Sequence, residues 1–353
     1  IRPGADALLL AAIANTIFSE GLANVGDHVR PHIAGLDVLP PALAPFTAEA
    51  VTKAVGVDAD TIKRLAREFA AADKALVYGR IGTCTVSFGT TASWLVDVVN
   101  TITGNLDREG GVMFPTPAAG NLTTRGAKGT GKGFQIGRGY SRVRRFPEAL
   151  GEYPVSVLAE EIATPGDGQI KAMITAGGNP VLSTPNTLAL EDAMKSLEFM
   201  ISVDIYLNET TRYADVILPP PSHLERSHFD LVFTGFSIRN VANYSEPVFE
   251  RDPSQPDEWE IFLKIAGIAQ GMGAGVDPAV VDDFTLDAFI GSIMKDSSSP
   301  TNGLTAEQVR EQLDATGARG ADRMLDLMLR TGPYGDGFGE NANGISLQRM
   351  KQH

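Results

Sequence analysis

Turn-forming residues, mostly glycine, asparagine and aspartate and in one place prolines and a serine, stand directly after short apolar runs at several points of the sequence, where they could hold a nucleotide. They are Gly79 and Gly82 after Ala75–Tyr78, Gly177, Gly178 and Asn179 after Ile170–Thr175, Asp204 after Phe199–Val203, and Pro219–Ser222 after Ala214–Leu218. Glycines in such turns let the backbone approach a phosphate closely, and a carboxylate offers paired acceptors to the N1–H and amino group of a guanine. Because these residue types also build ordinary turns, plain turn chemistry is the alternative.

The segment Gly126–Gly133 nearly fits the loop pattern that cradles phosphates, with Lys132 near its end. The pattern fails at its last position, where Gly133 stands in place of the Ser or Thr that would ligate Mg²⁺, and no strand is predicted before it. A flexible basic loop is therefore the favoured interpretation. A loop that helps to hold an anionic cofactor or substrate is the alternative.

Two histidine pairs are candidate metal ligands, but neither has the spacing of a site. His28 and His32 are four residues apart, yet the glycines and the proline around them argue against a helix that would align them. His223 and His228 are five residues apart and do not share a helical face. Because His223 directly follows a predicted strand end, it is the more credible ligand contact. We predict no metal ligand and no catalytic residue in this chain.

Alternating helices and strands must position these turns. Apolar residues at helical spacing predict helices over Leu8–Phe18 with Gly21 as C-cap, over Ala48–Val55 capped by Thr47, from Asp58 or Asp60 through Phe69, and over Thr90–Thr103. Ala75–Tyr78 is predicted to be a short buried strand that ends in the turn Gly79–Thr83. A strand, a glycine turn and a helix in this order are typical of a doubly wound α/β domain, which binds ligands at the carboxyl ends of its strands.

The second half of the chain repeats the alternation. Strands are predicted over Ile170–Thr175, Phe199–Val203 and Ala214–Leu218, with a helix over Thr187–Leu197. This order implies a mostly parallel sheet that brings the turn residues to one edge. Further along we expect a short hairpin or extended excursion over Phe229–Val241, a helix over Pro256–Gln270, helical stretches over 285–295, 305–316 and 321–329, and a Gly/Asn-rich linker from Gly332.

A basic, glycine-rich segment separates the two halves. No Asp or Glu occurs between Glu109 and Glu148, whereas seven Lys and Arg residues lie there. Positive charge gathered in an otherwise acidic chain attracts anions locally. The segment is therefore predicted to be a long loop that is either functional or mobile.

Size and composition restrict the class of protein. The 353 residues, 43% of them hydrophobic, allow two or three domains, and the net charge of −13 argues against a nucleic-acid binder. The longest apolar stretch, Ala7–Ala14, is too short to span a membrane. With Cys84 as its one cysteine, the chain can build no internal disulfide, no cysteine zinc cluster and no iron–sulfur cluster. Because the sequence starts at Ile1 without a Met or a signal peptide, we expect a piece of a longer polypeptide.

Several segments, taken together, resemble one protein family. Gly177–Pro185 contains a Gly-x-Asn-Pro turn, Ser202–Pro219 contains Asp204, Asn-Glu-Thr-Thr and Ala-Asp-Val-Ile-Leu-Pro, and Glu225 follows. Upstream, Arg2–Asp6 opens an alanine- and leucine-rich helix, and Thr103–Gly111 reads Thr-Gly-Asn-Leu-Asp-Arg-Glu-Gly-Gly. In order and spacing these segments resemble the molybdopterin oxidoreductases of the dimethyl-sulfoxide-reductase family. The resemblance covers Ile1–Gln270.

The resemblance implies an α/β fold with two Rossmann-like αβα domains, one of them incomplete, with mostly parallel sheets and a helical C-terminal extension. The domains would hold two molecules of molybdopterin guanine dinucleotide (MGD), which carry molybdenum or tungsten as bis-MGD. One guanosine end would contact Pro3, Gly4 and Asp6, helped by Gly79, Arg80, Gly82 and Thr83. The other would contact Gly178, Asn179, Asp204, Ser222 and His223.

The same resemblance implies a division of the chain into four parts. Residues 1–120 would be the C-terminal half of an inserted αβα domain, 121–150 the basic loop, 151–272 the second αβα domain, and 273–353 a helical extension and linker. The 4Fe-4S cluster and the metal ligand would precede Ile1, and a further domain would follow His353. This chain alone would therefore be inactive.

The intact protein would be a molybdenum or tungsten oxidoreductase. Its partners would be the rest of its own polypeptide, an electron-transfer subunit and a small-molecule substrate, without nucleic acid or a membrane span. The compartment stays open, with the bacterial cytoplasm preferred, and the basic loop would line the substrate funnel. Pro115–Asn121 stands where formate dehydrogenases carry Arg-Gly-x-Asn-Asn, which argues against formate. The alternatives are a non-catalytic relative, such as a respiratory-complex subunit, and a simple nucleotide-binding module.

Overall fold

The computed structural model describes residues 1–120 and 135–352 of the chain. The chain forms two compact units, Ile1–Pro115 and Thr116–His353, which are described separately below. The phosphate-loop-like segment Gly126–Gly133 lies outside the described residues.

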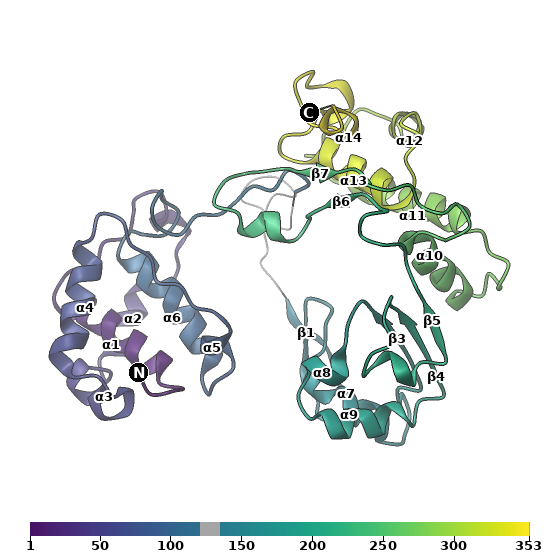
Figure 1. Ribbon diagram of the computed structural model, residues 1–353. Coiled ribbons are helices and arrows are strands. Elements are labelled where there is room, and N and C mark those ends of the chain that lie inside the picture. Colours follow the sequence, from purple (N-terminus) through teal and green to yellow (C-terminus); the bar gives the residue numbers. More distant parts are fainter. Residues whose placement is uncertain (121–134, 353) are drawn as a thin grey trace. The chain divides into compact units, whose positions relative to one another are not determined.

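The first unit is built from helices, which Figure 1 labels α1 to α6. They are α1 (Asp6–Ser19), α2 (Leu39–Leu43), α3 (Ala48–Val55), α4 (Ala59–Ala71), α5 (Ile81–Cys84) and α6 (Gly89–Ile102). Helix α1 lies between two hydrophobic clusters. Its residues Leu10, Ala14 and Ile17 pack in the cluster that contains the apolar face of α6, and Ala12 packs with residues of α3 and α4.

The helix starts in this unit follow local sequence signals. The hydroxyl of Thr47 accepts a hydrogen bond from the Ala50 N–H at 3.2 Å, and the Asp58 carboxylate accepts one from the Thr61 N–H at 2.8 Å. Both side chains thereby satisfy an N–H group that a helix leaves free at its start. The predicted helices and caps of α3 and α4 are confirmed, with Asp58 rather than Asp60 as the cap.

Helices α1 and α6 run in the same direction. The Asn24 N–H, which follows α1, donates to the Ile102 C=O at the end of α6 at 2.7 Å, so the carboxyl ends of the two helices meet. Both helices have 14 residues and share one core cluster. Their amino ends therefore lie toward the same end of the pair.

The strand predicted over Ala75–Tyr78 is not formed, and this prediction is wrong as drawn. The segment has no neighbouring strand among the described residues, and a single extended segment cannot make a sheet. The buried side chain of Asn100 makes the hydrogen bonds to Val77 that a neighbouring strand would make. The Val77 N–H donates to Asn100 Oδ1, and Asn100 Nδ2 donates to the Val77 C=O, both at 2.9 Å, while Asn100 is only 1% exposed.

The second unit combines strands and helices (Figure 1). Its α/β part comprises β1 (Ile136–Tyr140), β2 (Pro147–Ala149), α7 (Leu158–Ala163), β3 (Ala172–Ala176), α8 (Pro180–Ser183), α9 (Thr187–Met194), β4 (Phe199–Val203) and β5 (Val216–Leu218). It continues with β6 (His228–Phe229), β7 (Tyr244–Ser245), α10 (Glu258–Ala269), α11 (Pro278–Ile293), α12 (Ala306–Asp314), α13 (Gly320–Thr331) and α14 (Leu347–Met350). The α/β class and the helical C-terminal part are confirmed.

Strands β3, β4 and β5 form a parallel sheet in that order. Directly registered pairs include Thr175 with Ser202 and Val203 with Leu218. A cluster of residues from α7, α8 and α9, with Ile162, Val181 and Leu190 among them, packs against Met173 on one face of the sheet. The parallel sheet predicted from the alternation is therefore present, with β4 at its predicted bounds.

The helical part is joined internally by charge pairs. Arg323 of α13 is fully buried and forms ion pairs with Asp282, Asp283 and Asp314, which lie on α11 and α12. The tail beyond Gly332, expected to be a linker, packs back onto these helices. Phe338 and Leu347 are buried, and the Asp336 carboxylate accepts a hydrogen bond from Arg330 at 2.9 Å.

The basic segment contains a hairpin of β1 and β2, whose arginines face glutamates. Arg138 is paired with Glu148, while Arg142 and Arg144 pair with the adjacent Glu161 and Glu160 of α7. These pairs neutralise much of the charge that the sequence shows between residues 138 and 145. Arg145 lies over the ring of Tyr140, 5.0 Å from its centroid. The three basic residues between 121 and 134 lie outside the described part of the chain.

Candidate functional site

The turns that follow β3 and β4 come together at the carboxyl edge of the parallel sheet. The Gly177 N–H donates to the Val203 C=O at 2.9 Å, which joins the first residue after β3 to the last residue of β4. Gly178, Asn179 and Asp204 therefore lie at one edge, as the sequence predicts for adjacent parallel strands. Gly177 has φ +56°, a conformation that favours glycine and lets the chain turn sharply out of the sheet.

Asn179 is held by two residues that sequence reasoning missed. Its Oδ1 accepts from the Thr210 hydroxyl, and its Nδ2 donates to Glu209, both at 2.6 Å. This hydrogen bond from Asn179 is the main reason that the pKa of Glu209 lies below its usual value. The fully buried Thr210 hydroxyl also accepts from the Val181 N–H at 3.1 Å. The signal was the run Asn208-Glu-Thr-Thr shortly after the end of β4, because the buried members of such a run, Thr210 and Thr211, need hydrogen-bond partners.

Asp204 is the most buried of the predicted contacts, at 9% exposure. Its Oδ1 accepts from the Tyr206 N–H at 2.9 Å and its Oδ2 from Asn208 Nδ2 at 3.3 Å. Asn208 Oδ1 in turn accepts from the N–H groups of Thr210 and Thr211, both at 2.9 Å. The carboxylate is thus fixed in orientation, while each oxygen keeps capacity for a second hydrogen bond.

Ser222 and His223 follow β5, which ends at the same edge because Leu218 pairs with Val203. Glu225 accepts from the Ser222 N–H at 2.9 Å, and Arg226 Nη2 lies 2.9 Å from His223 Nδ1. Both residues are exposed, and Arg226 is also paired with Glu258 of α10. These contacts form a separate local network beyond the prolines that follow β5.

The predicted contacts of the first unit lie in two turns. Gly4, with φ +84°, precedes α1, which starts at Asp6. In the other turn the Thr83 N–H and hydroxyl both donate to the Arg80 C=O, at 2.9 and 2.7 Å. One turn leads into α1 and the other into α5 and α6, so both lie toward the same end of the parallel pair of α1 and α6. No described hydrogen bond joins them.

Three glycines of the predicted site differ in how much room surrounds them. A Cβ at Gly79 would come within 2.9 Å of the Thr83 hydroxyl and 3.3 Å of Val96, so packing within the chain explains that glycine. Among the described residues, a Cβ at Gly82 would meet no atom within 4 Å, and one at Gly178 would meet only the Ala176 C=O at 3.7 Å. Neither has a positive φ. Packing and backbone conformation within this chain therefore leave Gly82 and Gly178 unexplained, and their open surroundings suit a closely approaching ligand.

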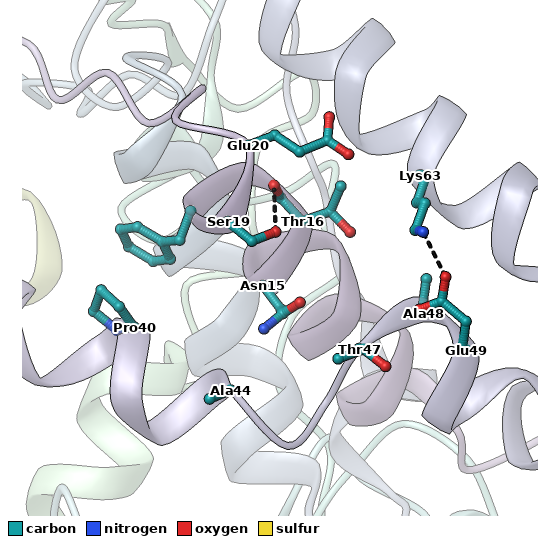
Figure 2. Close-up of a pocket in the computed structure, with 11 residues that line it drawn as sticks. Asn15, Thr16, Ser19, Glu20, Pro40, Ala44, Thr47, Ala48, Glu49 and Lys63 are labelled. Atoms are coloured by element: carbon teal, nitrogen blue, oxygen red, sulfur yellow. Dashed lines mark hydrogen bonds and ion pairs between the residues drawn. The ribbon is translucent and has the colours of Figure 1, made fainter.

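The first unit also contains a pocket of about 470 Å³, lined by residues of α1, α2, α3 and α4 and the turns between them (Figure 2). Its polar side chains are engaged with each other, with the backbone or, for Glu20, with Arg67 of α4. Glu49 pairs with Lys63, the Thr16 hydroxyl donates to the Ala12 C=O at 2.9 Å, and the Ser19 hydroxyl donates to the Thr16 C=O at 3.2 Å. The pocket contains none of the predicted contacts and presents no converging free groups, so we do not assign it a function.

In residues 1–120 and 135–352, no group of three or more His, Cys, Asp or Glu side chains is arranged to hold a metal ion. No helix in the described part of the chain is long and apolar enough to cross a membrane.

Known proteins resemble this chain in both sequence and fold. The chain is 29% identical over 281 residues to the F420-dependent formate dehydrogenase 2 subunit alpha of Methanococcus maripaludis, a match that covers 77% of this chain and 40% of the relative. It is 24% identical over 294 residues to the assimilatory nitrate reductase catalytic subunit of Bacillus subtilis, covering 78% of this chain and 39% of that protein. The chain thus spans about two fifths of the length of these relatives.

A solved structure shows the same fold. Acetylene hydratase from Pelobacter acetylenicus superposes with a TM-score of 0.61 at 17% identity, over 80% of this chain and 42% of that protein. The sequence model of the molybdopterin oxidoreductases matches residues 1–267, which include every predicted contact. The chain belongs to the molybdopterin oxidoreductase family.

Proposed function

We propose that this chain is the part of a larger molybdenum or tungsten oxidoreductase that binds the two guanosine ends of bis-MGD. Family membership implies a molybdopterin cofactor, and the relatives that the chain matches are redox enzymes by name. The division into residues 1–120, 121–150, 151–272 and 273–353 is part of the proposal. So is the expectation that the chain, taken by itself, is inactive.

The observation that carries the proposal is the carboxylate of Asp204. It is nearly buried, oriented by Tyr206 and Asn208, and located beside the open turn at Gly178. Guanine presents two adjacent donors, N1–H and the 2-amino group, which match the two oxygens of one carboxylate. At the carboxyl edge of a parallel sheet, such a carboxylate would hold the base while the glycine turn leaves room for the phosphates.

In the first unit the residues fit a second guanosine end less completely. Asp6 supplies a partly exposed carboxylate, and Gly82 supplies open space beside the Arg80 and Thr83 turn. Arg80 is exposed and offers a charge for a phosphate. We propose that Pro3, Gly4 and Asp6 contact one guanosine together with Gly79, Arg80, Gly82 and Thr83, and that Ser222 and His223 assist the grip around Gly178, Asn179 and Asp204.

When bound, the cofactor would supply the redox chemistry at its metal, and this chain would bind and orient it. Asp204 and Asn179 would bind the base. Hydrogen bonds from the turn between residues 206 and 211 already hold both side chains in place. A 4Fe-4S cluster and an electron-transfer subunit belong to the proposal for the intact protein, as do the metal ligand and the small-molecule substrate.

The test is the nucleotide content of the intact protein with Asp204→Asn. The amide turns an N–H donor toward the donors of guanine, so we expect GMP released by acid hydrolysis to fall by about tenfold or more, since one lost charge-assisted pair is worth about 1.5–3 kcal/mol. Asp215→Asn is the matched control. Its side chain lies at the opposite end of the sheet and accepts from the Met200 N–H at 2.8 Å, which an amide oxygen can still do.

Unchanged GMP content in the Asp204→Asn protein would contradict the proposal. The two alternatives give different results in the wild type. A non-catalytic relative would contain neither pterin nor metal. A simple nucleotide-binding module would bind free GMP or GDP to the intact protein, and Asp204→Asn would weaken that binding without any pterin being present.

A further inference from the structure

A second pocket of the first unit, of about 600 Å³, is lined mainly by apolar side chains. Leu36 and Val38 lie on the segment between α1 and α2, Trp94 and Val98 lie on α6, and Phe114 lies after α6. Val38, Trp94 and Phe114 are exposed by 58%, 49% and 64%, so the pocket opens to solvent through apolar groups. A concave, mostly apolar site of this volume is typical of those that bind small molecules.

Hydrogen bonds within the unit hold the walls of this pocket together. His28 Nε2 donates to the Asp107 C=O at 2.9 Å, and the Asn24 N–H donates to the Ile102 C=O at 2.7 Å. Both bonds join the segment after α1 to the end of α6 or to the residues that follow it. The pocket is therefore formed by the fold of the unit itself.

The pocket lies on the side of α6 that faces away from the Gly79–Thr83 turn. Val96 marks the side toward the turn, because its Cγ2 would lie 3.3 Å from a Cβ at Gly79. Trp94, which lines the pocket, is two residues from Val96 and therefore about 160° around the helix from it. None of the predicted cofactor contacts lines the pocket, which is therefore separate from the proposed guanosine site.

Asp97 is the acidic residue of this pocket. Burial against its apolar surroundings raises the pKa of the Asp97 carboxyl, and no charged partner among the described residues lowers it. The Thr101 hydroxyl, which also lines the pocket, donates to the Asp97 C=O at 2.7 Å and not to the carboxylate. A carboxylate that is partly removed from water and has no partner is stabilised when a cation approaches it.

Trp94 lies three residues before Asp97 on α6. Residues at this spacing are neighbours on a helix surface, so the indole and the carboxylate flank the same part of the pocket. The face of an indole attracts cations more strongly than that of any other aromatic side chain. His32, a metal-ligand candidate in the sequence, also lines the pocket and offers a ring nitrogen for a hydrogen bond.

We infer that this pocket binds a small organic cation with an apolar body and an amine nitrogen. The apolar body would lie against side chains such as Leu36, Val38 and Phe114, and the nitrogen would lie beside Asp97 and the Trp94 ring. An organic anion of the same shape would be repelled by the unpaired carboxylate. The inference is independent of the proposed cofactor role, because the two sites share no residue.

The test compares three probes of similar shape and different charge on the intact protein by ligand-observed NMR titration. They are phenethylamine, phenethyl alcohol and phenylacetate. We expect phenethylamine, a cation at neutral pH, to bind about fivefold or more tightly than the alcohol, and phenylacetate to bind more weakly than the alcohol. Equal affinities of the amine and the alcohol would overturn the inference, as would a failure of all three to bind because the rest of the polypeptide fills the pocket.

Three variants locate the preference. Asp97→Asn should reduce the affinity for phenethylamine to that for the alcohol, and Trp94→Leu should weaken amine binding by about two- to fivefold. Asp37→Asn is the matched control, because Asp37 is exposed between two lining residues but does not itself line the pocket. It should keep the full preference for the amine.

A preference that persists in Asp97→Asn, or that Asp37→Asn removes equally, would contradict a specific cation site at Asp97. Melting temperature and GMP content are measured on the same samples. Both should match the wild type in Asp97→Asn, because the carboxylate has no ion-pair partner among the described residues and is not a predicted cofactor contact. A loss of GMP in that variant would contradict the separation of the two sites.

Discussion

Two adjacent glycines allow the cofactor contact to be separated from the fold. Gly177 has φ +56°, so an alanine there must adopt the left-handed region, which costs about 1–2 kcal/mol. Gly178 has no such conformation, and its nearest atom to an added Cβ is the Ala176 C=O at 3.7 Å. Gly178→Ala should therefore stabilise the fold slightly, by about 0.4–1 kcal/mol, through the unfolded chain. The two variants are expected to differ in stability by about 1.4–3 kcal/mol.

The cofactor content is expected to respond in the opposite order. Gly178→Ala should lower it more than Gly177→Ala does, although Gly177→Ala is the variant that destabilises the fold more. If a phosphate lies against Gly178, the new methyl group crowds it, and such overpacking costs about 1–3 kcal/mol, or roughly a fivefold to more than hundredfold loss of affinity. The intact proteins would be compared by thermal unfolding and by GMP released per chain. A Gly178→Ala protein that unfolds at or above the wild-type temperature and still contains full GMP would refute the reasoning.

Three further changes test the framework that positions the site. Arg323→Met leaves Asp282 buried beside fewer partners and should destabilise the helical part by about 3–5 kcal/mol, seen as faster proteolysis within residues 273–352. Asn100→Ala removes both hydrogen bonds to Val77 and should cost about 1–3 kcal/mol in urea unfolding. The pKa of Glu148 is lowered to about 2 by its arginine partner and a backbone N–H, so its contribution is complete above pH 4.5 and disappears as the pH falls through about 2. Proteolysis of the β1–β2 hairpin at pH 5.5 should therefore match that at pH 7, and a loss of resistance already above pH 5.5 would contradict this pair.

Local sequence signals were sufficient where a helix or strand is determined by its own residues. Thr47 and Asp58 cap the helices that their types predict, and β4 has its predicted bounds because an apolar run between two turns has few alternatives. The predicted strand Ala75–Tyr78 failed for a non-local reason. A strand needs a neighbour, and among the described residues the partner of Val77 is the side chain of Asn100.

Charge and glycine patterns were less informative than they looked in sequence. The arginines between 138 and 145 suggested an anion-attracting loop, but three of them pair with glutamates from outside the basic run, at Glu148 and on α7. Gly79 and Gly82 looked equivalent, yet Gly79 is required by the packing of Thr83 and Val96, whereas Gly82 is not. The sequence shows that a glycine is present, but only the atoms around it show whether packing requires it.

The most direct test of the central claim is the stoichiometry of GMP, pterin and metal in the intact wild-type protein. Acid hydrolysis followed by nucleotide chromatography measures GMP, and elemental analysis measures molybdenum and tungsten. Two guanosine grips, one around Asp6 and one around Asp204, predict two GMP and two pterins for each metal atom. A protein that contains metal and pterin without GMP, or a single GMP per metal, would contradict the account.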